Sequence, residues 1–370
     1  MAANNNVLLD TSVTAVAATV APNSLTFQAG AGLSLNAGVI LNLSSGGILV
    51  RAGSVSTLSG GLFNQTSGLS PLNVWTVGDL TISAPINGGN GLSNAAMALV
   101  KAGAGTLTLA PAATSVNGLS AAGRNTMGGQ FVVNAGTLRL GPGVTNAFQA
   151  HNYFALNGGT LDLNGTSQMF YGFFSDSVVA GAPGVVTSSS GTGHLLISND
   201  NSGRNFAGAI QGATKLTRSG LSNLSFYSDS AYTGATVING GNILLRDGGA
   251  FSATSAIDIN YSGGLYLENA SSANNSNDRV ADAAPVTLRG GILELRGRAQ
   301  AATTETMGAV VLAQGASFIN SVAGGTGVNS ADLSLGALTR SANATVNFTA
   351  ATAGLAGSSA RIQFASIGGT

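Results

Sequence analysis

The sequence predicts an all-β chain that folds as a parallel β-helix, a solenoid in which short strands stack coil upon coil. A coil here means one full circuit of the chain around the solenoid axis. Three observations predict this fold: a glycine-led motif recurs, apolar and polar residues alternate within each copy, and helix signals are nearly absent. We expect one continuous domain over residues 1–370, with side loops near 145–185 and 268–284.

The recurring motif consists of one or two glycines followed by apolar residues in alternation. Its copies are Gly46–Val50, Gly105–Leu109, Gly136–Leu140, Gly158–Leu163, Gly240–Leu245, Gly263–Leu267 and Gly290–Leu295. The spacing is regular, because the step from Gly136 to Gly159 equals the step from Gly241 to Gly264. Such spacing is the period of a structural repeat.

Each motif copy predicts one short strand. The alternation puts Leu138 and Leu140 on one face and Arg139 on the other, which is the period of a half-buried strand. The leading glycines allow positive φ where the chain turns sharply between strands. The leucines predicted to point into the core are Leu138, Leu140, Leu161, Leu163, Leu265, Leu267, Leu293 and Leu295.

Further strands are predicted between the motif copies. They are 23–28, 74–82, 131–134, 236–239, 285–288 and 310–313. Two or three short strands in about 25 residues is the content of one β-helix coil. With about 4.8 Å between stacked strands, the chain predicts about 15 coils and a rod on the order of 70 Å long. A β-sandwich is the weaker alternative, because it does not predict a repeated Gly-Gly-X-Leu-X-Leu unit.

The composition excludes several classes of partner. Only 8% of the residues are charged, and 14 basic residues balance 14 acidic ones, so no electrostatic attraction to nucleic acid is expected. No apolar run approaches the roughly 18 residues of a membrane span, so we expect no membrane insertion. An apolar fraction of 44% disfavours disorder, despite 54 glycines.

The most specific sequence pattern lies between Leu216 and Leu244. Leu-Thr-Arg-Ser-Gly at 216–220, followed by Tyr-Thr-Gly-Ala-Thr-Val-Ile-Asn-Gly-Gly-Asn-Ile-Leu at 232–244, resembles the autotransporter-associated β-strand repeat. A shorter form runs from 99–103 to 131–138, and 278–291 and 305–312 are similar to connectors of that family. The resemblance covers nearly the whole chain.

This resemblance implies a right-handed parallel β-helix, an extracellular or bacterial cell-surface location, and a structural or adhesive role without a reaction. Two departures limit it. The shorter form lacks Tyr-Thr-Gly, and no β-barrel translocator follows Thr370, so export by the autotransporter route is not implied.

Enzymes with this fold need carboxylates that converge from adjacent coils, often with Arg or Lys. Four carboxylates lie in or just after a motif copy, namely Asp162, Asp247, Glu268 and Glu294. Stacking in register would align the last three as an outward acidic ladder, with Arg246 and Arg296 nearby. Solvated surface charges with weak pairing are the stronger interpretation. We therefore predict no catalytic residues and no enzyme.

Metal and cofactor sites are not expected either. His151 and His194 lie far apart in the sequence, and there is no cysteine to join them as a ligand. Calcium-binding β-rolls use Gly-Gly-X-Gly-X-Asp repeats, but this motif has leucine in place of the glycine and the aspartate. The segment 274–278 is rich in Asn and Asp, and a hydrated turn is a stronger interpretation than a cation site.

Aromatic residues concentrate in one part of the chain. They are Phe148, Tyr153, Phe154, Phe170, Tyr171, Phe173 and Phe174. They predict either a stack inside the coils or a patch for a carbohydrate or partner protein, and packing is the favoured interpretation.

Both ends of the chain continue the strand pattern without a polar cap, at 7–9 and 25–27 and again at 361–365. An uncapped β-helix exposes unpaired N–H and C=O groups that template further strands. Either the chain continues into more coils in its parent, or its last coil docks head to tail on another copy.

The sequence thus predicts an extracellular structural repeat protein, a segment or subunit of a bacterial surface fibre or filament, stacking end to end. The alternative is an adhesin-type passenger that binds a glycan or host ligand through its side loops. A polysaccharide-active β-helix enzyme is the third interpretation.

Overall fold

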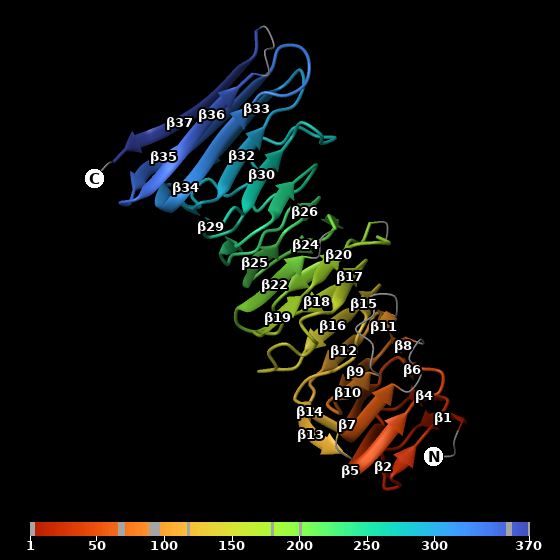
Figure 1. The fold of residues 1–370 in the computed structure, drawn as a ribbon. Coiled ribbons are helices and arrows are strands. Elements are labelled where there is room, and N and C mark those ends of the chain that lie inside the picture. Colours follow the sequence, from red (N-terminus) through yellow and green to blue (C-terminus); the bar gives the residue numbers. More distant parts are fainter. Residues whose placement is uncertain are drawn as a thin grey trace. The chain divides into compact units, whose positions relative to one another are not determined.

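The computed structural model describes residues 4–65, 71–88, 97–116, 119–178, 181–199, 202–352 and 357–368. Every regular element in these ranges is a β-strand (Figure 1). The chain divides into two compact units, Met1–His194 and Leu195–Thr370, and each is described by itself. Both are β-solenoids of parallel strands, with about 13 coils in all. The predicted all-β parallel β-helix is confirmed, whereas one continuous domain stays a prediction.

In the first unit the chain alternates between two parallel sheets. One sheet contains β1 (Asn6–Leu9), β4 (Ser24–Phe27), β6 (Gly47–Val50), β8 (Leu72–Thr76), β11 (Met97–Ala102), β15 (Gln130–Val133), β17 (Tyr153–Leu156) and β20 (Gly172–Phe174). The other contains β2 (Val13–Ala15), β5 (Gly32–Asn42), β7 (Val55–Gln65), β9 (Asp79–Ile82), β12 (Thr106–Leu109), β16 (Thr137–Leu140), β18 (Thr160–Asp162) and β21 (Val185–Thr187). Further strands are β3 (Thr19–Val20), β10 (Ile86–Gly88), β19 (Ser167–Phe170) and an antiparallel hairpin of β13 (Ala113–Val116) and β14 (Leu119–Ala122).

The second unit repeats this plan. One face carries β25 (Thr214–Gly220), β27 (Thr236–Ile238), β29 (Ile257–Asn260), β31 (Val286–Arg289), β33 (Ala302–Met307), β35 (Ser330–Arg340) and β37 (Ser359–Ile367). The other carries β23 (Arg204–Phe206), β26 (Asn223–Phe226), β28 (Asn242–Leu245), β30 (Gly264–Glu268), β32 (Ile292–Arg296) and β36 (Ala344–Ala351). β34 (Val310–Val322) bends and pairs with both β31 and β32. β24 (Ala209–Ile210) is short, and β22 (Gly193–Asn199) contains the unit boundary.

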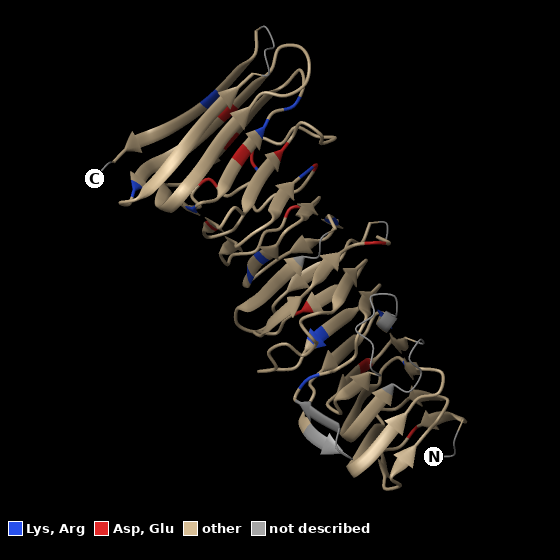
Figure 2. Ribbon diagram, in the orientation of Figure 1, with Lys and Arg blue, Asp and Glu red and all other residues tan. Residues whose placement is uncertain are grey.

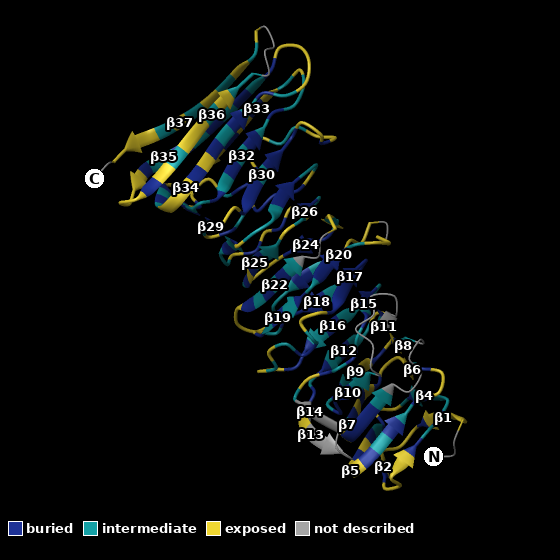
Figure 3. Ribbon diagram, viewed as in Figure 1, coloured by how far each residue is buried: buried dark blue, intermediate teal, exposed yellow. Residues whose placement is uncertain are grey.

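Parallel pairing in register stacks the predicted core leucines on one another. Leu138 pairs with Leu107 on one side and with Leu161 on the other. All eight leucines that the sequence predicts to point inward have no exposed surface. Figure 3 shows the resulting alternation of buried and more exposed positions along the strands. This prediction is confirmed.

Coil length is less uniform than the sequence predicts. Asn223 pairs with Asn242, whereas Phe318 pairs with Asn347, so the coil that starts at Phe318 is markedly longer. The long coils arise where strands such as β34, with 13 residues, bend and supply two faces of the solenoid. The predicted 15 coils are therefore too many.

The segment 145–185, for which the sequence predicts a side loop, carries β17, β18, β19 and β20 in its described part. Phe148, Phe154, Phe170 and Phe173 are fully buried inside the coils, and the ring centroids of Phe154 and Phe170 lie 4.6 Å apart. Burial of these rings draws the segment into regular coils, which confirms packing for these four residues. Tyr153 and Phe174 join a separate small cluster that Tyr171 packs against.

The other predicted side loop, 268–284, falls in a segment without regular strands. No strand lies between the end of β30 at Glu268 and the start of β31 at Val286, a segment that is described throughout. A single bridge between Phe251 and Val280 ties the loop to the previous coil.

Candidate functional site

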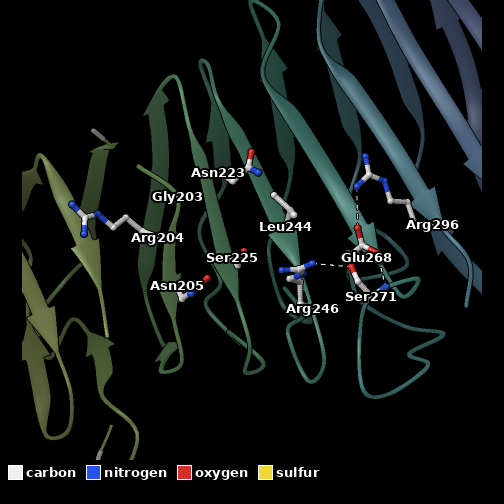
Figure 4. A pocket seen from close by; sticks show the side chains of 10 residues that line it. All are labelled: Gly203, Arg204, Asn205, Asn223, Ser225, Leu244, Arg246, Glu268, Ser271 and Arg296. Atoms are coloured by element: carbon white, nitrogen blue, oxygen red, sulfur yellow. Dashed lines mark hydrogen bonds and ion pairs between the residues drawn. The ribbon is translucent and has the colours of Figure 1, made fainter. Parts of the chain in front are cut away.

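A polar groove of about 480 Å³ crosses the outer face of β23, β26, β28, β30 and β32 in the second unit (Figure 4). Its lining includes three arginines, Arg204, Arg246 and Arg296, and one carboxylate, Glu268. Figure 2 shows the other charged residues spread over strands and loops of both units. The groove holds three of the 14 basic residues and one of the 14 acidic residues, in a chain whose net charge is zero.

Strand register explains the shape of the groove. Asn205, Ser225, Leu244 and Tyr266 form one outward column across four coils. Ser225 and Leu244 are only 5% and 7% exposed, so they form a low floor. The column on one side contains asparagines, where Asn242 Nδ2 donates to Asn223 Oδ1 at 2.8 Å. Stacked amides of this kind add hydrogen bonds between coils.

The opposite wall is a column of alternating charge. Glu268 pairs with Arg296, and Arg246 lies one position beyond the paired part of β28. Glu268 is almost fully buried, and its Oε2 accepts a hydrogen bond from Arg296 Nη1 at 2.9 Å. Arg296 Nε also donates to Glu294 Oε1 at 2.5 Å. Burial alone would lower the pKa of Arg296. The hydrogen bonds to Glu294 and Glu268, together with their negative charges, outweigh burial and raise the pKa overall.

Arg246 is bound differently. Its Nη2 donates to Ser271 Oγ at 2.7 Å, and its Nε has no hydrogen-bond partner. Among the residues that the structure describes, no carboxylate forms an ion pair with Arg246. Arg246 is thus a half-buried cation whose charge is not neutralised by a direct partner.

The outward acidic ladder considered from the sequence does not form. Glu268 lies opposite Arg296, and Glu294 lies in the neighbouring column. Asp247 leaves the strand with a φ of 49° and accepts a hydrogen bond from the backbone N–H of Ala273. Like charges on adjacent strands repel, so opposite charges alternate along this column. Glu268 is also buried, where the sequence predicts a solvated carboxylate.

Asp162, the fourth carboxylate, is buried as well, with an exposed fraction of 1%. It pairs with Arg139 Nε at 2.7 Å. Burial alone would raise its pKa, but hydrogen bonds from Ser189, Arg139 and Asn164 outweigh burial and hold the pKa below its usual range. Asp162 is therefore a buried, hydrogen-bonded carboxylate and not a solvated surface charge.

Lys101, a basic residue of the shorter repeat form, is completely buried. Its Nζ donates to the carbonyl oxygens of Ala102, Gly103 and Ala135 at 3.0, 2.8 and 2.9 Å. Burial lowers the pKa of Lys101 to about 8, and the charge of Asp79 partly opposes this. Three donated bonds require the ammonium form, so Lys101 joins carbonyls of two successive coils as a cation.

Arg218 occupies the corresponding place in the second unit. It has no exposed surface, and its Nη2 donates to the carbonyl of Ser222. A Cβ atom at Gly241 would lie 2.5 Å from Arg218 Nη2, and one at Gly136 would lie 2.6 Å from Lys101 Nζ. The basic residue of one coil thus occupies the space beside a glycine of the next coil. Sequence reasoning missed this role, although each cation lies two residues after a buried leucine, Leu99 or Leu216, and so falls on the inward face of its strand.

Another buried pair anchors the loop 268–284. Arg279 has no exposed surface, and its Nη2 donates to Asn269 Oδ1 at 2.7 Å. Glu305 is 1% exposed and accepts the backbone N–H groups of Arg279 and Val280 at 3.0 and 2.9 Å. Burial raises the pKa of Glu305 to about 8. Burial also lowers the pKa of Arg279, against the charge of Glu305.

The histidines and the Asn-rich turn do not form a ligand group. His151 is exposed and stacks on Tyr171, with ring centroids 4.7 Å apart, and His194 is half-buried in β22. No cluster of three or more His, Asp or Glu side chains suited to a metal occurs in the described ranges. Asn275 Oδ1 accepts a hydrogen bond from Thr303 Oγ1 at 2.8 Å, so this turn is bound to β33.

The last coil leaves its core side chains half covered. Phe348 lies opposite the buried Ile319, and Ile362 lies opposite the buried Leu333, so both side chains point inward. Phe348 is nevertheless 45% exposed, and its ring contacts Phe364 at 5.6 Å between centroids. β36 and β37 each pair on one side, with β34 and β35, and Figure 3 shows both strands largely exposed.

The first coil is more closed. β1 pairs with β4 and β2 with β5, and each lies at the edge of its sheet. Their inward residues Leu9 and Ala15 are only 3% and 7% exposed. The exposed core layer is therefore a feature of the last coil.

Among the described residues, no helix has the length and apolar character needed to cross a bilayer. No protein-family model, curated protein or solved structure matches the chain. The resemblance to the autotransporter-associated repeat therefore stays a prediction.

Proposed function

We propose that the chain is an extracellular structural repeat protein, a segment or subunit of a bacterial surface fibre. In this fibre the solenoids stack end to end, and the last coil of each copy forms the contact. The half-exposed core layer of β36 and β37 carries the proposal. Core side chains that face solvent favour a further layer, because each half-exposed aromatic or aliphatic side chain loses about 1 kcal/mol of burial.

The partner in this proposal is the first coil of a second copy. Parallel pairing of β1 and β2 on β36 and β37 keeps the inward and outward alternation that every other coil follows. A head-to-tail contact of this kind generates an open filament. β1 has four residues and β2 has three, so the contact is small and association should be weak and dependent on concentration.

The charge arrangement supports a role without catalysis. Glu268 and Glu294 each hydrogen-bond Arg296, and Glu305 is enclosed by backbone N–H groups. Carboxyl groups held in this way are positioned as structural partners and not as a converged acid and base. The extracellular, cell-surface location rests on the repeat resemblance.

Sedimentation velocity across a concentration series tests the proposal. We expect the wild-type chain to form larger species at high concentration and Phe348→Lys to remain monomeric, because a lysine at the edge opposes strand addition. Leu221→Lys is the matched control, since Leu221 is 83% exposed and lies outside the last coil. A wild-type chain that stays monomeric at high concentration, or equal association of Phe348→Lys, would contradict the proposal.

A second candidate function is adhesin-type glycan binding, which the polar groove favours. Ser271, from the side loop 268–284, forms part of the groove lining. A loop and five strands thus contribute to one surface.

A further inference from the structure

We propose that the polar groove of the second unit binds a saccharide chain that carries carboxylate groups. In this complex the Arg246 guanidinium pairs with an acid group of the ligand, and the asparagine amides bond its hydroxyl groups. The inference concerns the side of the solenoid and is independent of end-to-end association.

The positive charge for this site comes from Arg246. Of the charged side chains in its column, Glu268 is already bound by Arg296 Nη1 and by the backbone N–H of Ser271, at 2.9 and 3.1 Å. Within the described residues, the side-chain hydrogen bond of Arg246 goes to a neutral acceptor, the hydroxyl of Ser271. A planar guanidinium matches the two oxygens of a carboxylate, so an arriving acid group supplies the missing counter-charge.

The uncharged part of the groove fits sugar hydroxyls. Asn205 and Asn223 are exposed, and Asn242 is half-buried. Amides of this kind both donate and accept hydrogen bonds, as sugar hydroxyls require. Beside the groove, the hydroxyl of Tyr227 donates to Asn205 Oδ1 at 3.3 Å. The low floor of Ser225 and Leu244 leaves room for a chain to lie across the strands (Figure 4).

Repetition across coils favours a polymer over a single small anion. The asparagine column spans two adjacent coils, at Asn223 and Asn242, and so offers two equivalent amides at the strand spacing of about 4.8 Å. Nucleic acid is a poorer fit, because it requires several unpaired cations and open aromatic faces. Arg296 is held by two carboxylates, and its guanidinium lies 4.4 Å from the ring centroid of Tyr266.

Isothermal titration calorimetry tests the site on the full chain carrying Phe348→Lys, so that end-to-end association does not affect the result. The probes are tetragalacturonate, its fully methyl-esterified form, a hyaluronan tetrasaccharide and sodium sulfate. We expect binding of the two acidic saccharides and at least about tenfold weaker binding of the ester and of sulfate, because a charged hydrogen bond is lost with the ester and the neutral contacts are lost with sulfate.

The variants Arg246→Gln and Lys215→Gln form a matched pair. Each removes one positive charge, but Lys215 is exposed on β25, on the other face. We expect Arg246→Gln to weaken saccharide binding about 10- to 100-fold and Lys215→Gln to leave it unchanged. Circular dichroism checks the fold. Should Arg246→Gln misfold, Asn205→Trp, at an exposed position of the groove, should abolish binding by filling it.

Any one of four results would overturn the proposal. The first is that neither acidic saccharide binds, and the second is that the ester binds as tightly as the acid. The third is that sulfate binds as tightly as the saccharides, and the fourth is that the groove variants bind like Lys215→Gln. Equal binding by sulfate would identify a lone-anion site. If the wild-type chain does not associate end to end but the saccharides bind as expected, only the proposed structural role is refuted.

Discussion

Replacing Glu305 with glutamine should remove a pH dependence from the stability of the second unit. Burial raises the pKa of Glu305 from 4.5 to about 8. The folded carboxyl group therefore keeps its proton up to about pH 8, whereas the unfolded one loses it near pH 4.5. Between these values the folded state binds more protons, so the free energy of unfolding falls as the pH rises.

The size of the effect follows from the interval between the two pKa values. One pKa unit corresponds to about 1.36 kcal/mol, so the stability lost between pH 4.5 and pH 8 has an upper limit of about 5 kcal/mol. We expect between about 2 and 5 kcal/mol, with no further change above pH 8 from this group. The glutamine side chain cannot titrate, but its carbonyl oxygen can still accept the N–H groups of Arg279 and Val280.

Urea unfolding at pH 5, 6, 7 and 8 measures this dependence, and the difference between wild type and Glu305→Gln isolates the contribution of Glu305. Hydrogen exchange of peptides covering 278–284 reports the same loop locally. Asp282→Asn removes a carboxylate from an exposed position in that loop and controls for loss of charge. If Glu305→Gln keeps the wild-type pH slope to within about 0.5 kcal/mol, the assignment of a buried protonated carboxyl is refuted.

Three further substitutions probe other parts of the fold by urea unfolding. Lys101→Met leaves buried carbonyls without a donor and should cost about 2 to 4 kcal/mol; a cost below about 0.5 kcal/mol would show that they find other partners. Leu161→Ala should cost about 2 to 5 kcal/mol, whereas Leu221→Ala, at an exposed position, should cost less than about 0.5 kcal/mol; equal costs would contradict the inward register. Gly136→Ala should cost about 1 to 3 kcal/mol or more, because the residue has a φ of 68° and its Cβ would lie 2.3 Å from the carbonyl of Gly103; a neutral result would exclude this strain.

The core could be predicted from the sequence because its signal is local. Leu138 and Leu161 follow a two-residue alternation directly after glycine, and the same pattern identifies the strand and its inward face. The number of coils depends on where long strands bend, as β34 does near Gly315. In β34 the buried positions shift from Val310 and Leu312 to Ser317, Ile319 and Ser321 across the bend. Two of the later three are serines, so the apolar pattern of the sequence does not reveal this shift.

The charged sites could be predicted only in part, because their partners lie one coil away. Arg246, Glu268 and Arg296 belong to successive coils of unequal length, as the pairs Asn242–Gly264 and Gly264–Ile292 show. An error of one residue in the predicted length of either coil moves the charged side chain to the opposite face of the strand. Lys101 shows the same limit, since one of its carbonyl partners, on Ala135, belongs to the next coil.

Unequal coil lengths also bear on how the chain finds its strand order. The glycine–leucine strands are nearly interchangeable in sequence, so β26 gains similar edge hydrogen bonds from β28 or from β30. The connecting segments are not interchangeable, because the chain lengthens at each step from Asn223 to Asn242, from Asn242 to Gly264 and from Gly264 to Ile292. If a strand pairs with the wrong neighbour, the connecting segment is too long or too short for the distance that it spans. The buried Lys and Arg side chains then no longer reach the carbonyl groups that they bind. Irregular spacing thus acts against misthreading, and it favours addition of coils one at a time, in sequence order, onto an edge that is already formed.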